Sequence, residues 1–179
     1  MELREKKIQP RRSFIFTPGL KPEMYPKALA SGTDMVCIEL EDGIAPKDKE
    51  EARKKALNLF KDKQVDDGIE RIIRINSVRE HFGILDLQEI LISENPPPAI
   101  MLPKVKTPDE VVLVDTLLNE KGLDCRLHVI IETNEGLKNA GKLRDKRARL
   151  TSRPQKRSDR AKDTYAQKCA NKGNLHKHL

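Results

Sequence analysis

The sequence predicts an α/β protein built on a parallel sheet. Along residues 12–140, five short apolar runs are separated by stretches of helical character. Proline and glycine residues mark many of the boundaries, and polar residues gather where the apolar runs end. Strands that alternate with helices at this spacing are typical of βα units, whose right-handed crossovers place the carboxyl ends of all strands at one edge of the sheet. Ligands bind at that edge in such folds.

The predicted strands and helices follow one another in regular order. The strands are expected at residues 12–19, 36–43, 70–76, 99–105 and 126–133. The helices are expected at residues 22–30, 46–60, 85–92 and 108–121. Proline at the first helical position marks three of these helices, and Gly32 and Gly122 mark two of the helix ends. At the last helix, Thr107 and Glu110 form a capping box around Pro108, which predicts where that helix begins.

The second apolar run, VCIELEDG, ends in three carboxylates within four positions, Glu39, Glu41 and Asp42. A run of this kind predicts a buried strand that delivers acidic groups to the edge of the sheet. Carboxylates gathered there either hold a cation or a basic ligand group, or are only a polar strand end before a glycine turn. This stretch alone leaves both interpretations open.

Polar residues also end the next three predicted strands. Arg74 and Asn76 end the third strand, Lys104 the fourth and Glu132 the fifth. An arginine fork suits a carboxylate, and Mg²⁺ takes one or two protein carboxylates together with substrate oxygens and waters. These residue types suggest a metal that polarises a carbonyl while the arginine holds a carboxylate. The alternative is an ordinary ion pair between Arg74 and Glu132 at the edge of the sheet.

Charge separates the first part of the chain from the last. Residues 1–140 carry 22 Lys and Arg against 25 Asp and Glu, a net charge of −3, whereas residues 141–179 carry 13 against 3, a net charge of +10. The last segment has few bulky apolar residues, so we expect one folded domain in residues 1–140 and a disordered basic tail in residues 141–179. Such a tail suits nucleic acid, but only Tyr165 offers an aromatic ring for base stacking, so nucleic-acid binding is the second alternative function.

Targeting signals and reactive cysteines are not predicted. The first residues, MELREKKIQPRR, lack the apolar core of a secretory signal, and no window reaches the roughly 20 apolar residues of a membrane span. We therefore expect a soluble, cytoplasmic protein without a membrane partner. Cys37, Cys125 and Cys169 are too few and too scattered for a disulfide framework or a paired metal site, so reduced thiols are expected.

Five segments, in this order, resemble the family of the citrate lyase beta subunit and malyl-coenzyme A lyase. They are RSFIFTPGLKPEM, KALASGTDMVCIELEDGIAPKDKEEAR, RIIRINS, AIMLPKVKTPDE and VIIETNEGLKNA. The resemblance implies a TIM-type (β/α)₈ barrel, of which this stretch supplies about five units. It also implies a Mg²⁺-dependent lyase that cleaves a 3-hydroxyacyl-CoA thioester, of the citryl-CoA or malyl-CoA type, to an acyl-CoA and a 2-oxo acid. Members are usually oligomeric, so a homo-oligomer is expected if the fold is completed.

The resemblance assigns roles at the carboxyl ends of the strands. Arg74 is expected to bind the substrate carboxylate, and Glu132 is expected to be a Mg²⁺ ligand that also contacts the substrate. Glu41 and Asp42 are expected near the metal and its waters. In a retro-aldol cleavage, Mg²⁺ supplies Lewis-acid polarisation and orientation together.

Three further residues, Phe16, Lys21 and Lys27, are expected along the coenzyme A moiety. They lie in the segment FTPGLKPEMYPK. Position 21 is often arginine in the family, and position 39 is commonly Asp rather than Glu.

The resemblance ends near residue 140. Family members continue into an apolar strand of the LLFGxxD type, whose Asp is the second Mg²⁺ ligand, and no such strand follows Ala140 here. We therefore expect a truncated lyase domain. An inactive truncated or frameshifted remnant of such a lyase is the first alternative function, since the abrupt rise in positive charge at the same point suggests a shifted reading frame.

Overall fold

The computed structural model describes residues 11–61 and 67–144, and within them five parallel strands form one sheet. The strands are β1 (Phe14–Pro18), β2 (Met35–Glu39), β3 (Glu70–Arg74), β4 (Ala99–Leu102) and β5 (Arg126–Val129). Each strand pairs in parallel with the next strand along the chain, which gives the order β1-β2-β3-β4-β5. This consecutive order confirms the predicted α/β class and shows that the units wind in one direction.

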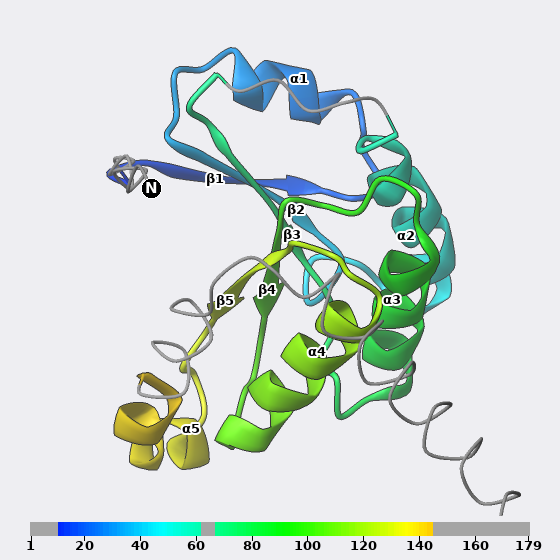
Figure 1. Ribbon diagram of the computed structural model, residues 1–179. Coiled ribbons are helices and arrows are strands. Elements are labelled where there is room, and N and C mark those ends of the chain that lie inside the picture. Colours follow the sequence, from blue (N-terminus) through cyan, green and yellow to red (C-terminus); the bar gives the residue numbers. More distant parts are fainter. Residues whose placement is uncertain (1–10, 62–66, 145–179) are drawn as a thin grey trace, which may run out of the picture.

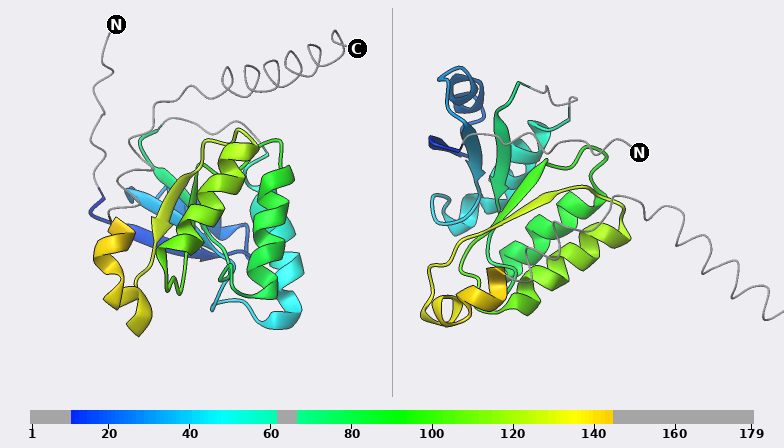
Figure 2. Two further views of the ribbon diagram at one scale, coloured as in Figure 1. Left: turned by 60° about the horizontal axis from the view of Figure 1, so that its bottom comes forward. Right: turned by 60° about the vertical axis from the view of Figure 1, so that its left-hand side comes forward.

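Helices connect the strands. They are α1 (Met24–Leu29), α2 (Lys49–Asn58), α3 (His81–Ile92), α4 (Pro108–Glu120) and α5 (Asn134–Lys138), with a 3₁₀ turn η1 (Pro46–Asp48) before α2. Helices α2, α3 and α4 lie side by side along one face of the sheet (Figures 1 and 2). The predicted capping box is present at α4, where the N–H of Thr107 donates to Oε1 of Glu110 at 3.0 Å. Every helix of the described part is too short or too polar to cross a membrane.

The main core lies between the sheet and these helices. Four strand residues that belong to it are 0% exposed: Val36, Ile38, Ile73 and Ile100. Ala52 and Ala56 of α2, and Phe60 just after it, are buried in the same core. Burial of a side chain as large as Ile or Phe contributes roughly 1.5–3 kcal/mol to the stability of the folded chain.

The opposite face of the sheet carries a smaller apolar cluster. Cys37, Ile72 and Ala99 form it, with Met35 and Met101 packed against them. Burial raises the pKa of the Cys37 thiol, which keeps this cysteine protonated and unreactive. Free thiols are found at both described cysteines, as predicted.

At the amino ends of the strands, the same face carries a charged cluster around Glu70. Its carboxylate lies 2.6 Å from Nε of Arg11, 2.5 Å from Nη1 of Arg126 and 2.8 Å from Nε2 of His128. Burial raises the pKa of Glu70, but the hydrogen bonds from His128, Arg11 and Arg126 outweigh it and hold this pKa well below its usual range. The cluster therefore ties β3 to β5 and to the segment before β1.

The observed strands end earlier than predicted. For example, β2 ends at Glu39 and β5 at Val129, whereas the apolar runs predicted strands through residues 43 and 133. The reason is local: a turn follows β2, in which the N–H of Ile44 donates to the carbonyl of Glu41 at 3.0 Å. The acidic residues at 41, 42 and 132 therefore lie in βα loops rather than on strands.

The last described residues continue the fold past the predicted domain end. Residues 140–144 are helical, and Leu143 is 4% exposed and belongs to the main core. The rest of the predicted basic tail, residues 145–179, lies outside the described residues. The structure therefore does not test whether this segment binds nucleic acid. The division of the chain at residue 140 stays a prediction.

Candidate functional site

Arg74 and the acidic residues of the second unit meet at the carboxyl ends of the strands. Arg74 is the last residue of β3 and is the register partner of Glu39, the last residue of β2. Its Nε atom lies 2.5 Å from Oε2 of Glu39 and 3.4 Å from Oε2 of Glu41. In the part of the chain that the structure describes, Arg74 thus pairs with Glu39 and Glu41 rather than with Glu132.

Phe16, from β1, lies against the same arginine. The Cζ atom of Arg74 is 4.9 Å from the centroid of the Phe16 ring, which is a cation–π distance. Burial lowers the pKa of Arg74, but the close contact with Glu39 and the charges of Glu39 and Glu41 raise it by more. The guanidinium therefore stays charged and is held between an aromatic ring and two carboxylates.

The side-chain carboxylate of Glu41 is buried at this end of the sheet and accepts no hydrogen bond. Its side chain is 4% exposed, and neither carboxylate oxygen accepts a hydrogen bond, although Lys104 lies 2.9 Å away and Arg74 lies 3.4 Å away. Burial raises the pKa of Glu41, and the two cations offset this only in part. The carboxylate therefore retains the capacity to accept from a further donor or cation.

Lys104 joins three of the predicted acidic residues. Its ammonium lies 2.9 Å from Oε1 of Glu41 and 2.8 Å from Oδ1 of Asp42, while its backbone N–H donates to Oε1 of Glu132 at 2.8 Å. The ammonium lowers the pKa of Asp42, and both carboxylates raise the pKa of Lys104. The sequence indicated a polar residue at this strand end but assigned it no role.

The Glu132 loop is docked onto the loop that follows β4. The hydroxyl of Thr133 donates to the carbonyl of Val105 at 3.1 Å and accepts from the N–H of Gly136 at 2.9 Å. A Cβ atom at Gly136 would lie 2.3 Å from the Val105 carbonyl, so only glycine allows this approach. These contacts bring Glu132 within reach of the Lys104 backbone.

A buried ammonium supports the loop that carries Glu41. The Nζ atom of Lys49 donates to the carbonyls of Leu40 and Glu41 at 2.9 and 2.8 Å, and to Oδ1 of Asn76 at 2.5 Å. The side chain of Asn76 also donates to the Leu40 carbonyl at 3.0 Å. Burial lowers the pKa of Lys49, and the surrounding acids oppose this. Sequence reasoning missed Lys49, because a lysine near a helix start is usually solvated.

Asp86 extends this support into α3. It is 1% exposed, and its Oδ2 accepts from the backbone and side chain of Asn76 at 2.8 and 2.6 Å. Its Oδ1 accepts from Nε of Arg53, on α2, at 2.6 Å. A buried network thus connects both helices to the backbone beneath Glu41.

Comparison with known proteins decides the family. Residues 12–149, which are most of the chain, match the HpcH/HpaI aldolase/citrate lyase family. The chain belongs to this family. The expected relation to citrate lyase beta and malyl-CoA lyase proteins is confirmed.

Two curated relatives of this aldolase/citrate lyase family illustrate the match. The chain is 34% identical to the mitochondrial citramalyl-CoA lyase of Homo sapiens over 106 residues, which are 59% of this chain and 31% of that protein. It is 33% identical to the L-malyl-CoA/beta-methylmalyl-CoA lyase of Rhodobacter capsulatus over 134 residues, which are 70% of this chain and 42% of that protein. The chain therefore spans less than half the length of these relatives.

A solved structure supports the fold assignment. The citrate lyase beta subunit from Mycobacterium tuberculosis, complexed with oxaloacetate and magnesium, superposes with a TM-score of 0.57 at 26% identity. The match covers 74% of this chain and 54% of that one. The five βα units thus correspond to part of the TIM-type barrel of citrate lyase beta proteins.

The two lysines expected along coenzyme A lie apart from the contacts described so far. Lys21 follows β1 and Lys27 lies in the last turn of α1, and both are exposed. Neither side chain takes part in the ion pairs that join Arg74, Glu41 and Lys104. Contact of Lys21 and Lys27 with coenzyme A stays a prediction.

The acidic residues fit a divalent cation as a partial donor set. Mg²⁺ takes one or two protein carboxylates and fills its octahedron with waters and substrate oxygens. Glu41 has two buried oxygens without hydrogen bonds, and Glu132, in the loop after β5, accepts from the backbone of Lys104, whose ammonium contacts Glu41. Across residues 11–61 and 67–144, no group of three or more His, Cys, Asp or Glu side chains could hold a metal ion by itself.

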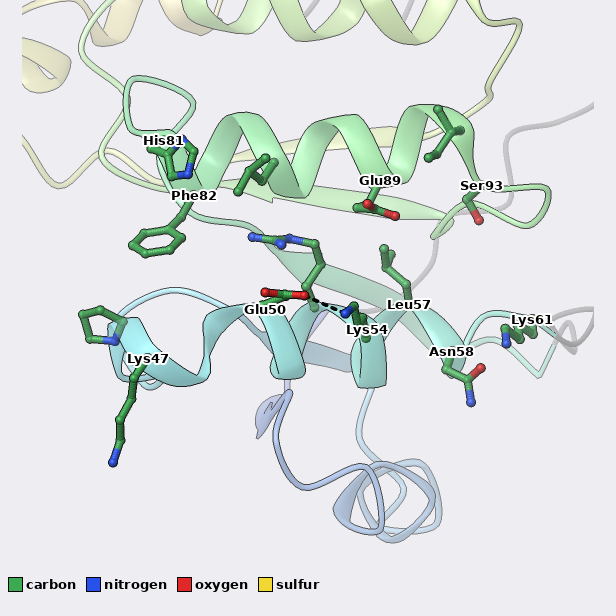
Figure 3. Close-up of a pocket in the computed structure, with 14 residues that line it drawn as sticks. Lys47, Glu50, Lys54, Leu57, Asn58, Lys61, His81, Phe82, Glu89 and Ser93 are labelled. Carbon is green, nitrogen blue, oxygen red and sulfur yellow. Dashed lines mark hydrogen bonds and ion pairs between the residues drawn. The ribbon is translucent and has the colours of Figure 1, made fainter.

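A groove between α2 and α3 is a separate feature of the surface (Figure 3). Lys47, Glu50 and Lys54 line one side of it, and His81 and Phe82 line the other. None of the predicted site residues lines this groove. It therefore has no part in the function assigned to the strand ends.

Proposed function

We infer that the protein acts as a Mg²⁺-dependent carbon–carbon lyase on carboxylated 3-hydroxyacyl-CoA thioesters. Substrates of the citryl-CoA or malyl-CoA type would give an acyl-CoA and a 2-oxo acid. Family membership supports this proposal, and so do the acyl-CoA lyase activities named for the two curated relatives. The observation that carries it is the convergence of Arg74 and Lys104 on Glu41 at the carboxyl ends of the strands.

The reaction is a retro-aldol cleavage. The bond between the α- and β-carbons of the thioester breaks, the β-hydroxyl loses its proton and becomes the carbonyl of the 2-oxo acid, and the electron pair passes to the thioester enolate. A proton then returns to that enolate to give the acyl-CoA. Both charged species along this path require stabilisation by fixed charges.

Arg74 is the group assigned to the substrate carboxylate. A guanidinium recognises a carboxylate through its planar fork, and Arg74 stays charged because Glu39 and Glu41 raise its pKa above the ordinary value. Glu39 and the Phe16 ring fix its orientation from two sides. A fixed orientation lowers the entropy lost when the substrate binds.

Glu132, Glu41 and Asp42 are the groups assigned to Mg²⁺. Glu132 would be a direct ligand, and the other two would accept hydrogen bonds from metal-bound waters. Bound Mg²⁺ would supply Lewis-acid polarisation of the carbonyl oxygen and orientation of the substrate. The Lys49 and Asn76 hydrogen bonds hold the backbone that places Glu41.

Coenzyme A would contact the stretch from β1 to α1. Phe16 lies in β1, Lys21 follows it and Lys27 lies in α1. All three are exposed, and lysine ammoniums suit phosphate oxygens. A cytoplasmic location, and a homo-oligomeric assembly where the barrel fold is completed, belong to the same proposal.

A substrate panel tests this function. Malyl-CoA, citramalyl-CoA and citryl-CoA are each incubated with the protein in MgCl₂ or in EDTA, and the released 2-oxo acid is measured. We expect cleavage of at least one thioester in MgCl₂ only, with a KM for that thioester raised about tenfold or more in Arg74→Ala. Failure to cleave any of the three, together with a melting temperature that MgCl₂ does not shift, would support an inactive remnant instead.

A further inference from the structure

Lys104 is the residue on which the proposed magnesium site converges. Its ammonium contacts Glu41 and Asp42 at 2.9 and 2.8 Å, and its backbone N–H reaches Glu132 at 2.8 Å. Glu41 and Asp42 lie in the loop after β2, and Glu132 lies in the loop after β5. A single residue in the loop after β4 therefore contacts carboxylates from the loop after β2 and from the loop after β5.

The backbone of Lys104 is adapted to this double contact. Its φ is 51°, and no other non-glycine residue of the described chain has a positive φ. This left-handed conformation is unfavourable for a residue with a Cβ atom, and such conformations persist where the surroundings require them. Here it directs the N–H to Glu132 while the side chain reaches Glu41 and Asp42.

Lys104 is the cation whose ammonium contacts both Glu41 and Asp42. Glu39 is paired with Arg74 at 2.5 Å. The Lys49 ammonium is buried and donates to two backbone carbonyls and to Asn76. Lys104 is different, because its side chain is 40% exposed and its ammonium can exchange a carboxylate for water.

We propose that Lys104 is a counter-cation that competes with a divalent cation for Glu41 and Asp42 and so sets the metal affinity of the site. The inference rests on the proposed Mg²⁺-dependent function and names the residue that regulates its metal binding. The Lys104 ammonium and the waters of a bound metal ion would donate to the same carboxylate oxygens of Glu41 and Asp42, and the two cations repel each other, so the ammonium must withdraw when the metal binds. A unit charge a few ångströms from a second cation near a protein surface changes its affinity about tenfold.

Magnesium titration tests this role without relying on catalysis. MgCl₂ is titrated calorimetrically into the wild-type protein and the variants Lys104→Met and Lys104→Arg. We expect Lys104→Met to bind Mg²⁺ about tenfold more tightly than wild type. Lys104→Arg keeps the charge and is expected to stay within about twofold of wild type. The gain in Lys104→Met should shrink as NaCl is added, because salt screens the competing charge.

Lys106→Met is the matched control. Lys106 has the same charge and nearly the same exposure, 41%, but it pairs with Glu135 at 3.0 Å. Its replacement should leave the Mg²⁺ affinity within about twofold of wild type. An equal gain in Lys106→Met would show a general effect of net charge and would overturn the proposal.

The remaining outcomes separate this inference from the proposed function. The proposal that Lys104 competes with Mg²⁺ is overturned if Lys104→Met binds Mg²⁺ no more tightly than wild type. It is also overturned if neither protein binds Mg²⁺. Failure of the proposed function has another signature. In that case Glu132→Gln binds Mg²⁺ like wild type, or no thioester is cleaved, while Lys104→Met still shows its tighter binding.

Discussion

Arg74 and Glu39 end neighbouring strands in register, and Nε of Arg74 lies 2.5 Å from Oε2 of Glu39. Their side chains are 16% and 7% exposed, so this ion pair is largely removed from water. Glu41 shares the same guanidinium at 3.4 Å. The arginine assigned to the substrate is thus also the cation that compensates two buried carboxylates.

Arg74→Ala should therefore destabilise the fold as well as weaken substrate binding. Removal of one partner from a buried ion pair typically costs about 3–5 kcal/mol, because the other charge stays buried without compensation. Urea denaturation measures the free energy of unfolding. The double variant Arg74→Ala/Glu39→Gln should lose less stability than the sum of the two single variants. Additive losses would show that the pair is not coupled.

Asp86→Ala should destabilise the fold by a similar amount. Asp86 is 1% exposed and accepts hydrogen bonds from Arg53 and Asn76, so its loss leaves a buried guanidinium without its partner, at about 3–5 kcal/mol. Glu50→Ala is the control, since it breaks the exposed pair with Lys54 and should change the free energy of unfolding by only about 0.5 kcal/mol. Equal urea midpoints for the two variants would contradict this account of the network.

Gly136→Ala should weaken magnesium binding by about tenfold or more. A Cβ atom at this position would lie 2.3 Å from the Val105 carbonyl, so the loop that carries Glu132 would have to move away from the Lys104 backbone. Gly141→Ala is the matched control, because a Cβ there meets nothing within 4 Å. Calorimetric titration with MgCl₂ compares the two variants. Unchanged affinity in Gly136→Ala would show that the docking of this loop does not place the ligand.

Much of the fold follows from local patterns in the sequence. Apolar runs and proline or glycine boundaries predicted all five strands and four of the helices. The capping box at Thr107 predicted the first residue of α4. Polar residues after the strands predicted that Arg74, Glu41 and Glu132 would lie at one edge of the sheet, because parallel strands bring their carboxyl ends together. The one ion pair considered for Arg74, with Glu132, is replaced in the described residues by pairs with Glu39 and Glu41.

The partners of these residues could not be predicted in the same way. Lys104 and Asp42 are 62 positions apart, and their contact depends on the position of β4 relative to β2 in three dimensions. The pairing of Arg74 with Glu39 depends on strand register, which the apolar pattern does not specify to a single partner. The helix α5 was not predicted because only five residues form it and they have no apolar period.

Acid should weaken the fold through Glu70. Burial raises the pKa of this carboxyl, but the hydrogen bonds from His128, Arg11 and Arg126 outweigh it and hold the pKa well below the ordinary value of 4.5. Because the folded-state pKa is the lower one, the cluster stabilises the fold above the ordinary pKa and loses this effect as the pH falls toward the folded-state pKa.

The comparison of wild type with Glu70→Gln isolates this effect. Urea denaturation at about pH 7 and about pH 3 gives the free energy of unfolding of each protein, and the advantage of wild type should be smaller at the lower pH. An advantage that does not change with pH would mean that the charge of Glu70 contributes nothing to stability.

We propose that Glu132 serves a Mg²⁺-dependent cleavage of carboxylated acyl-CoA thioesters. The most direct measurement is the rate of 2-oxo acid release by wild type, Glu132→Gln and Glu135→Gln under the same MgCl₂ concentration. Glu135 is the matched control, since it is an exposed acid in the first turn of α5, just after the loop of Glu132, and pairs only with Lys106 among the ion pairs of the described residues. The predicted result is a loss of at least about a hundredfold in Glu132→Gln and less than about twofold in Glu135→Gln. Turnover of Glu132→Gln at the wild-type rate would contradict the assignment.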